Sequence, residues 1–107
     1  MSQLADLLRR FGETDPHDNY DFDIEESVAF ADFFNNGGLE FHLNGLNYAL
    51  VYAALYDDGN VKIGAWAWLD GEDFDEKATF EVYEEDDFSG GEIDRIYKRI
   101  KEIYGHD

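Results

Sequence analysis

Carboxylates are the most abundant groups in this chain that could do chemistry, and they gather in two segments. The sequence holds 26 Asp and Glu against 8 Lys and Arg in 107 residues, for a formal net charge of −18. Residues 13–26 contribute −7 with no base, and residues 70–87 contain ten acids opposed only by Lys77. Glycosidases use a pair of carboxylates, but so many pairs are available here that none is singled out. The acidic segments therefore point to no particular catalytic pair.

Metal binding is the next chemistry that acidic loops suggest. A calcium loop of the EF-hand type needs glycine at its sixth position and a Glu six residues later. The loops that begin at Asp15 and Asp70 both lack that glycine. The three histidines, His17, His42 and His106, lie far apart in the chain and do not have the spacing of a zinc site. We therefore expect no bound metal and no other cofactor.

Nucleophilic catalysis also lacks its usual residues. The chain has no cysteine, which excludes thiolate nucleophiles, disulfides and cysteine-ligated zinc. None of the three serines, Ser2, Ser27 and Ser89, stands in a G-x-S-x-G motif. A phosphate cradle at Gly90-Gly91 would be opposed by the acids around it. We therefore expect that the protein is not an enzyme.

The N-terminal third of the chain predicts two helices. Leucines at helical spacing predict a short amphipathic helix over residues 3–11, which Gly12 ends. A second apolar stripe predicts a helix over residues 24–35. Asp23 is its expected N-cap, because Glu26 follows three residues later at the spacing of a capping box.

The C-terminal segment predicts an amphipathic helix. Ser89 and Glu92 have the spacing of a capping box, and isoleucines and tyrosines then recur on one face up to Tyr104. Lysines and arginines in the second half suit the helix dipole, and Gly105 ends the pattern. This helix is expected to pack its apolar face on a sheet.

The middle of the chain predicts strands. Apolar residues alternate with polar ones, and Asn44-Gly45 is typical of a type I′ hairpin turn. The predicted strands cover residues 39–43, 46–56, 61–69 and 78–83. We therefore expect one acidic domain over residues 1–107, of the α+β class: a four-stranded antiparallel β-meander with N-terminal helices and a C-terminal amphipathic helix.

Trp66 and Trp68 share one face of the third predicted strand. Tyr48, Tyr52 and Tyr56 are expected to lie on the same face across the strand pair. Such a face is either the second side of the core, covered by a helix, or an exposed aromatic patch that binds a partner. We favour the covered face, because three helices need sheet surface to pack against.

The charge balance excludes whole classes of partner. Binding to nucleic acid through its phosphates requires a basic face, and an anionic membrane surface also attracts bases. No stretch approaches the ~20 apolar residues of a membrane helix, and residues 1–11 lack the pattern of a secretory signal. We therefore expect no direct contact with nucleic acid, no membrane association and a cytoplasmic location.

The acidic segments are expected to form two rows of negative charge. In Tyr20-Asp21-Phe22-Asp23, acids alternate with aromatic residues. In an extended segment, residues two apart lie ~6.6 Å apart on one side. The acids at 70–76 and 84–87 would make the second row. A basic nucleic-acid-binding protein would be steered toward such rows, because they present what a phosphate backbone presents.

A partner-binding site in two rows, with aromatic anchors between them, follows from these patterns. Its predicted residues are Asp18, Tyr20, Asp21, Phe22, Asp23, Glu25, Glu26, Asp70, Glu72, Asp73, Phe74, Asp75, Glu76, Glu84, Glu85, Asp86, Asp87 and Phe88.

In size and charge, the chain is similar to the small acidic DNA-mimic inhibitors of phages, the anti-restriction and anti-CRISPR proteins. The resemblance implies a non-enzymatic inhibitor that blocks the basic nucleic-acid-binding surface of a CRISPR effector, a restriction enzyme or another nuclease. Two alternatives stay open. One is an immunity protein that neutralises a basic toxin nuclease, and the other is a small-ligand or metal-binding domain that uses the face of Trp66 and Trp68.

Overall fold

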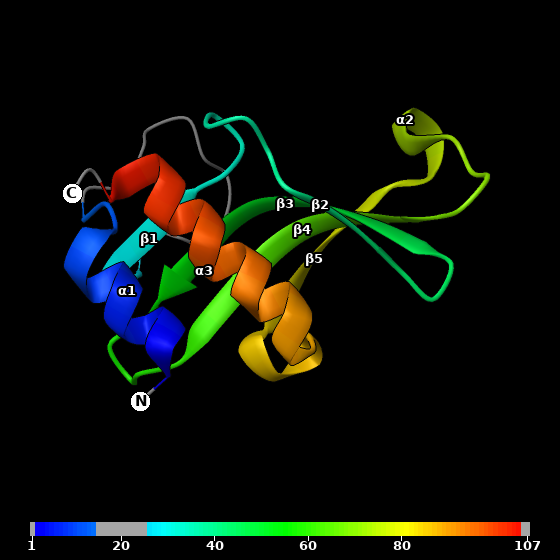
Figure 1. The fold of residues 1–107 in the computed structure, drawn as a ribbon. Helices are drawn as coiled ribbons and strands as arrows, with labels where there is room; N and C mark the ends of the chain where they lie inside the picture. The colour runs from blue at the N-terminus through cyan, green and yellow to red at the C-terminus, as the bar shows by residue number, and fades with distance from the viewer. Residues whose placement is uncertain (1, 15–25, 106–107) are drawn as a thin grey trace.

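The fold is an antiparallel sheet of five strands with three α-helices, seen in a computed structural model that describes residues 2–14 and 26–105. Its elements are α1 (Gln3–Phe11), β1 (Ala29–Asp32), β2 (Glu40–Leu43), β3 (Leu46–Leu55), β4 (Val61–Leu69), α2 (Phe74–Lys77), β5 (Thr79–Glu84), the 3₁₀ helix η1 (Glu85–Asp87) and α3 (Gly90–Tyr104) (Figure 1). The α+β class is confirmed. The four predicted strands correspond to β2–β5, and β1 is a fifth.

The predicted helix over residues 24–35 is wrong where the structure describes it. Residues 29–32 form β1, which pairs antiparallel with β3. All four are buried, and neighbouring side chains enter different cores, Phe30 on one face of the sheet and Ala31 on the other. An apolar run this short does not distinguish a buried strand from a buried helix by its periodicity. The expected N-cap, Asp23, lies outside the described residues.

Strands β1 and β2 form one interrupted edge strand. β1 pairs with residues 52–55 of β3, and β2 pairs with residues 46–49 of the same strand. Residues 33–39 leave the edge between them. The N–H of Phe33 donates to the carbonyl of Val51 at 2.8 Å, so β3 stays hydrogen-bonded at the gap. The interruption opens a groove at this edge of the sheet.

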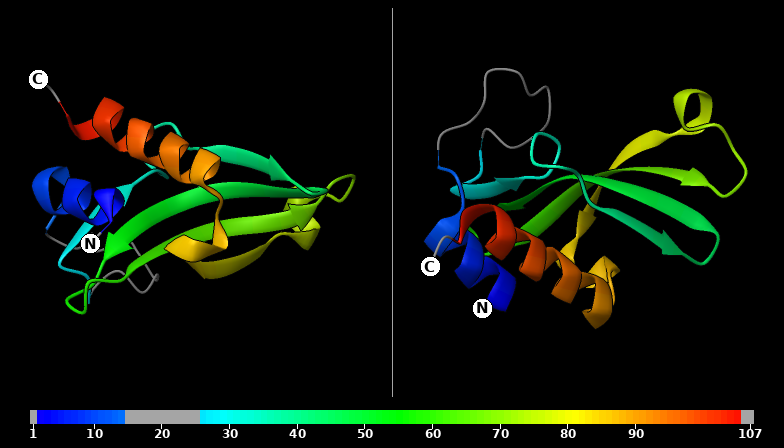
Figure 2. Two further views of the ribbon diagram at one scale, coloured as in Figure 1. Left: turned by 60° about the horizontal axis from the view of Figure 1, so that its bottom comes forward. Right: turned by 45° about the horizontal axis from the view of Figure 1, so that its top comes forward.

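Helices α1 and α3 lie side by side on one face of the sheet, as two views show (Figures 1 and 2). Leu4 and Leu8 of α1 are buried against the sheet, as are Ile96 and Ile100 of α3. Both helices have the predicted bounds, and Ser89 caps α3 in the predicted capping box with Glu92. The β2–β3 hairpin and α2 extend beyond the part of the sheet that these helices cover.

A β-bulge in β3 divides the side chains between the two faces. The pairing register shifts between Leu50 and Tyr52, and Val51 is the extra residue. Tyr48 therefore packs on the helix-covered face, whereas Tyr52 packs on the other face with Trp66. The expectation that Tyr48 lies on the tryptophan face is wrong, because a bulge shifts the alternation by one residue.

Candidate functional site

Ten carboxylates lie in the outer strand of the sheet and in the two segments that flank it along the chain. β5 is the terminal strand in the order β1-β3-β4-β5, with the α2 connection before it and η1 after it (Figure 1). We call the acids of residues 70–87 the acidic β5 edge: Asp70, Glu72, Asp73, Asp75, Glu76, Glu81, Glu84, Glu85, Asp86 and Asp87. The predicted second row is therefore two clusters at opposite ends of β5, with Glu81 between them.

Three of these acids hold the β4–β5 connection in shape. Asp70 accepts a hydrogen bond from the side-chain amide of Asn47 at 2.9 Å. Glu72 accepts from the backbone N–H of Leu69 at 3.3 Å, and Asp73 is the N-cap of α2. Acids at such positions satisfy N–H groups that the turn leaves without a backbone partner.

Two more acids form a reciprocal cap around η1. The carboxylate of Asp87 accepts a hydrogen bond from the backbone N–H of Glu84 at 2.9 Å, and the Glu84 side chain accepts from the backbone of η1 in return. Burial, followed by the neighbouring Tyr48, Glu81 and Asp87, raises the pKa of Tyr83 above its ordinary value. Two acids of the edge, Glu81 and Asp87, thus contribute to this shift after burial and Tyr48.

The side-chain carboxylates of the other five acids make no hydrogen bond or ion pair within the described residues: Asp75, Glu76, Glu81, Glu85 and Asp86. Ion pairs occur instead on α1, between Arg9 and Asp6, and on α3, where Lys98 pairs with Asp94 and Arg99 with Glu102. All five are exposed to solvent except Glu85, which is partly buried. These five carboxylates are therefore the ones available to a partner.

The first predicted row cannot be placed in the same way. Asp18, Tyr20, Asp21, Phe22, Asp23 and Glu25 lie outside the described residues. Glu26 is described and is exposed.

The two predicted anchors in the second acidic segment differ. Phe88 is only 8% exposed and packs edge-on against Tyr48 and Tyr83 at centroid distances of 5.9 and 5.5 Å. It belongs to the core and is not available as an anchor, because it packs among rings of β2, β3 and β5. Phe74 of α2 is 41% exposed and lies edge-on to Trp68 at 4.7 Å.

An aromatic surface covers the sheet face opposite α1 and α3. Trp66 contacts Phe80 at 5.4 Å between centroids and Phe74 at 6.3 Å. The expectation that a helix covers this face is wrong at the tryptophans: in the described part the helix beside them is the four-residue α2, which places Phe74 against both (Figure 2). Trp66 and Trp68 are therefore partly exposed.

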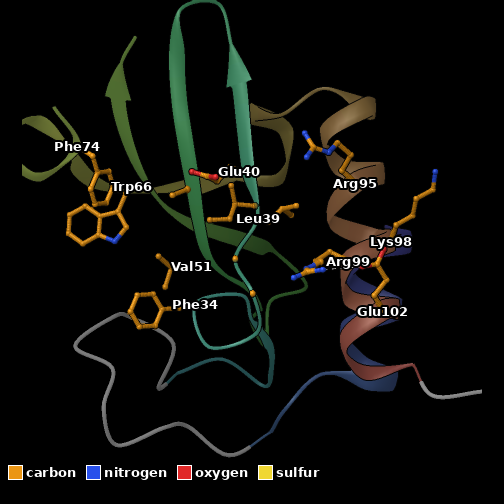
Figure 3. Close-up of a pocket in the computed structure, with 14 residues that line it drawn as sticks. Phe34, Leu39, Glu40, Val51, Trp66, Phe74, Arg95, Lys98, Arg99 and Glu102 are labelled. Carbon is orange, nitrogen blue, oxygen red and sulfur yellow. Dashed lines mark hydrogen bonds and ion pairs between the residues drawn. The ribbon is translucent and has the colours of Figure 1, made fainter. Parts of the chain in front are cut away.

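A groove of about 850 Å³ runs from this aromatic surface across the interrupted edge to α3 (Figure 3). Phe34, Val51, Trp66 and Phe74 lie on one side of it. Arg95, Lys98 and Arg99 lie on the other. Sequence reasoning missed the groove, because its lining comes from distant segments and depends on the gap between β1 and β2.

The cations at the groove already have partners. Arg95 lies over the ring of Phe41 at 4.6 Å, and Lys98 pairs with Asp94 at 3.0 Å. Arg99 donates to the carbonyl of Asn36 at 2.8 Å, which ties α3 to the segment that interrupts the edge. Of the three, Arg99 is the partly buried cation that links α3 to the sheet edge, whereas Arg95 and Lys98 are exposed.

Within residues 2–14 and 26–105, no group of three His, Asp or Glu side chains could hold a metal ion. None of the helices described there has the length and apolar character needed to cross a membrane. No family model, curated protein or solved structure matches this chain.

Proposed function

We propose that this chain is a non-enzymatic acidic inhibitor. It occupies the basic nucleic-acid-binding surface of a target such as a CRISPR effector, a restriction enzyme or another nuclease. The acidic β5 edge carries the proposal: ten carboxylates, with Lys77 as the only base in the same segment, lie in the outer strand of the sheet and its two flanking segments. Like charges placed this close destabilise a compact domain, so their clustering favours a role in binding.

The two acidic clusters lie at the two ends of β5. At about 3.4 Å per residue, the six residues of β5 span about 17 Å. The acids of residues 70–76 precede this strand, those of residues 84–87 lie at its end, and Glu81 lies between them. A basic groove that holds a phosphate backbone would meet carboxylates at both ends and in the middle of the edge.

The proposal also holds that these carboxylates have no catalytic role. Asp75, Glu76 and Glu81 are exposed to solvent. A carboxyl group that acts as a general acid near neutral pH needs burial or a close like charge to hold its proton. Exposed carboxylates at a sheet edge are suited to steering and contact instead.

Competition with DNA tests the proposal. Partners are captured at low salt, identified by mass spectrometry and purified, and each is then loaded with a labelled DNA duplex. The protein is expected to displace the duplex, and its association rate is expected to fall steeply between about 50 and 200 mM salt. The protein alone is expected not to retain the duplex in a gel shift. A partner that binds this protein and DNA at the same time would overturn the proposal.

A matched pair of variants separates the edge from total charge. Glu76→Gln with Glu81→Gln removes two charges from the acidic β5 edge. Glu40→Gln with Glu102→Gln removes two charges from β2 and α3, outside the acidic β5 edge, and also breaks the ion pair of Glu102 with Arg99. Only the first pair is expected to slow association several-fold, because rim charges act mainly on the association rate.

An immunity protein for a toxin nuclease would behave identically in these experiments, and the identity of the captured partner distinguishes it. The groove supports a second candidate function, the binding of a small molecule, because its volume of about 850 Å³ lies in the range of ligand sites. Trp66 lines the groove, so ligand binding there would change tryptophan fluorescence, and a Trp66→Phe variant would remove that change.

A further inference from the structure

The outer edge of β5 is open to another strand. β4 pairs with β5 from Ala67↔Thr79 to Lys62↔Glu84, and no strand among the described residues pairs with its other side. In the left view of Figure 2, β5 lies at the margin of the sheet. An edge strand presents a row of backbone donors and acceptors that a second chain can pair with.

The direction of the backbone at this edge follows from a single hydrogen bond. The N–H of Glu84 donates to the Asp87 carboxylate, not to β4, so it points outward. Backbone groups alternate in direction along an antiparallel strand, so the N–H and carbonyl of Val82 also point away from β4. The Val82 side chain is 47% exposed on the same face as Trp66.

The negative charge around β5 determines which kind of strand can pair with its open edge. Antiparallel pairing of two copies of β5 would place the acids of the α2 connection opposite those of η1, and like charges opposite each other are destabilising. The acids thus protect the edge against self-association. They favour a strand with basic residues, since opposite charges across a strand pair are stabilising.

We propose that an extended basic segment of the partner adds to β5 as a sixth strand. This inference rests on the proposed function and specifies how the partner docks. The incoming strand places an apolar residue beside Val82 on the tryptophan face and a lysine or arginine beside Glu81 on the other face. Backbone hydrogen bonds to Val82 supply affinity, and the alternation of side chains supplies specificity.

Amide exchange with a model peptide tests the docking mode. The probe is a short peptide of alternating lysine and valine, and its control is the same peptide with alternate backbone nitrogens methylated. The first peptide is expected to slow hydrogen exchange at the Val82 amide, and the methylated control is expected to have no such effect. If the peptide binds but hydrogen exchange at the Val82 amide is unchanged, the contact is charge attraction without strand pairing. That result would overturn the inference.

Two variants test the edge independently. Val82→Pro removes an N–H that the β4–β5 ladder does not use, and edge strands tolerate proline there. It is expected to abolish peptide binding, whereas Val82→Thr, which keeps the N–H, is expected to retain it. Should the proline variant unfold, Glu81→Lys keeps the backbone and is expected to weaken binding about fivefold. Unchanged affinity in Glu81→Lys, or in a folded Val82→Pro, would contradict the inference.

The same measurements separate this inference from the proposed function. A partner that competes with DNA but leaves Val82 exchange unchanged supports the function and overturns strand addition. A basic peptide that protects Val82, when no captured partner competes with DNA, supports strand addition and overturns the function.

Discussion

The backbone N–H of Asp32 donates a hydrogen bond to the hydroxyl of Tyr104 at 3.0 Å. Asp32 ends β1, and Tyr104 is the last residue of α3, so the bond joins the edge of the sheet to the end of the C-terminal helix. Glu13, which pairs with Phe30 through its backbone, also hydrogen-bonds the same hydroxyl. One tyrosine therefore connects α3, β1 and the segment after α1.

The stability of the fold is expected to fall above pH 10 because of this tyrosine. Burial, together with the charge and hydrogen bond of Glu13, raises the pKa of Tyr104 to about 12. Between about pH 10 and 12 the unfolded chain loses the proton while the folded chain keeps it, so the free energy of unfolding decreases as pH rises. Urea unfolding across this range measures the slope.

The Tyr104→Phe variant tests the assignment of that slope. It is expected to remove the part of the pH dependence above pH 10 that Tyr104 causes. It is also expected to lower the free energy of unfolding by about 1–2 kcal/mol at neutral pH, because the Asp32 N–H loses its acceptor. Tyr97→Phe makes the same change on the same helix and serves as the control. An unchanged alkaline slope in Tyr104→Phe would contradict the role given to this hydroxyl.

A second prediction follows from the close approach of Gly64 to Tyr52. A Cβ at Gly64 would collide with the Tyr52 ring and lie 2.8 Å from the ring of Phe80. Gly64→Ala is therefore expected to destabilise the protein by about 1–3 kcal/mol through overpacking. Gly90→Ala, with no atom within 4 Å of the added carbon, is the control and is expected to be neutral or slightly stabilising. Thermal unfolding that gives equal midpoints would contradict the packing argument.

Sequence alone predicted the elements whose signals are local. Asn44 and Gly45 both have positive φ, 53° and 82°, as the type I′ turn requires, and this turn sets the β2–β3 pairing. Ser89 and Glu92 form the capping box that starts α3. Each of these features depends on residues within four positions of one another, which is why the sequence is sufficient.

The features that sequence reasoning missed depend on distant contacts. Ala29–Asp32 is a strand because β3 and the two cores bury both of its faces, and no local residue encodes that. The Val51 bulge moves Tyr48 to the other face, although the local alternation continues unbroken through it in the sequence. In the candidate site, the acids were identified by composition, but Phe88 was placed wrongly because its burial depends on Phe41, Tyr48 and Tyr83, which are distant or separate from it in the sequence pattern.

The acids of η1 are expected to differ in their effect on stability. Asp87 accepts a hydrogen bond from the N–H of Glu84, whereas Asp86 is exposed and forms no bond within the described residues. Asp87→Ala is expected to cost about 0.5–2 kcal/mol, the usual loss for a removed cap. Asp86→Ala removes the same charge but no hydrogen bond, so the free energy of unfolding of this variant is expected to stay the same or increase. Equal changes of the two variants in urea unfolding would show that the hydrogen bond of Asp87 contributes nothing to stability.

Salt is expected to stabilise the fold through screening alone. With a net charge of −18, repulsion among the acids opposes folding, and added ions weaken it over a distance of about 8 Å at physiological ionic strength. Sodium chloride should therefore raise the unfolding temperature gradually.

Comparison with calcium decides whether screening is sufficient. Magnesium and calcium chloride at equal ionic strength are expected to raise the unfolding temperature equally and without saturation, because no three-carboxylate cluster in the described part of the chain could hold a metal. Calorimetry provides the independent measurement. Stoichiometric calcium binding with a dissociation constant below ~10 μM, the range of regulatory sites, would mean that the acids form a real site and would favour the metal-binding alternative over the inhibitor.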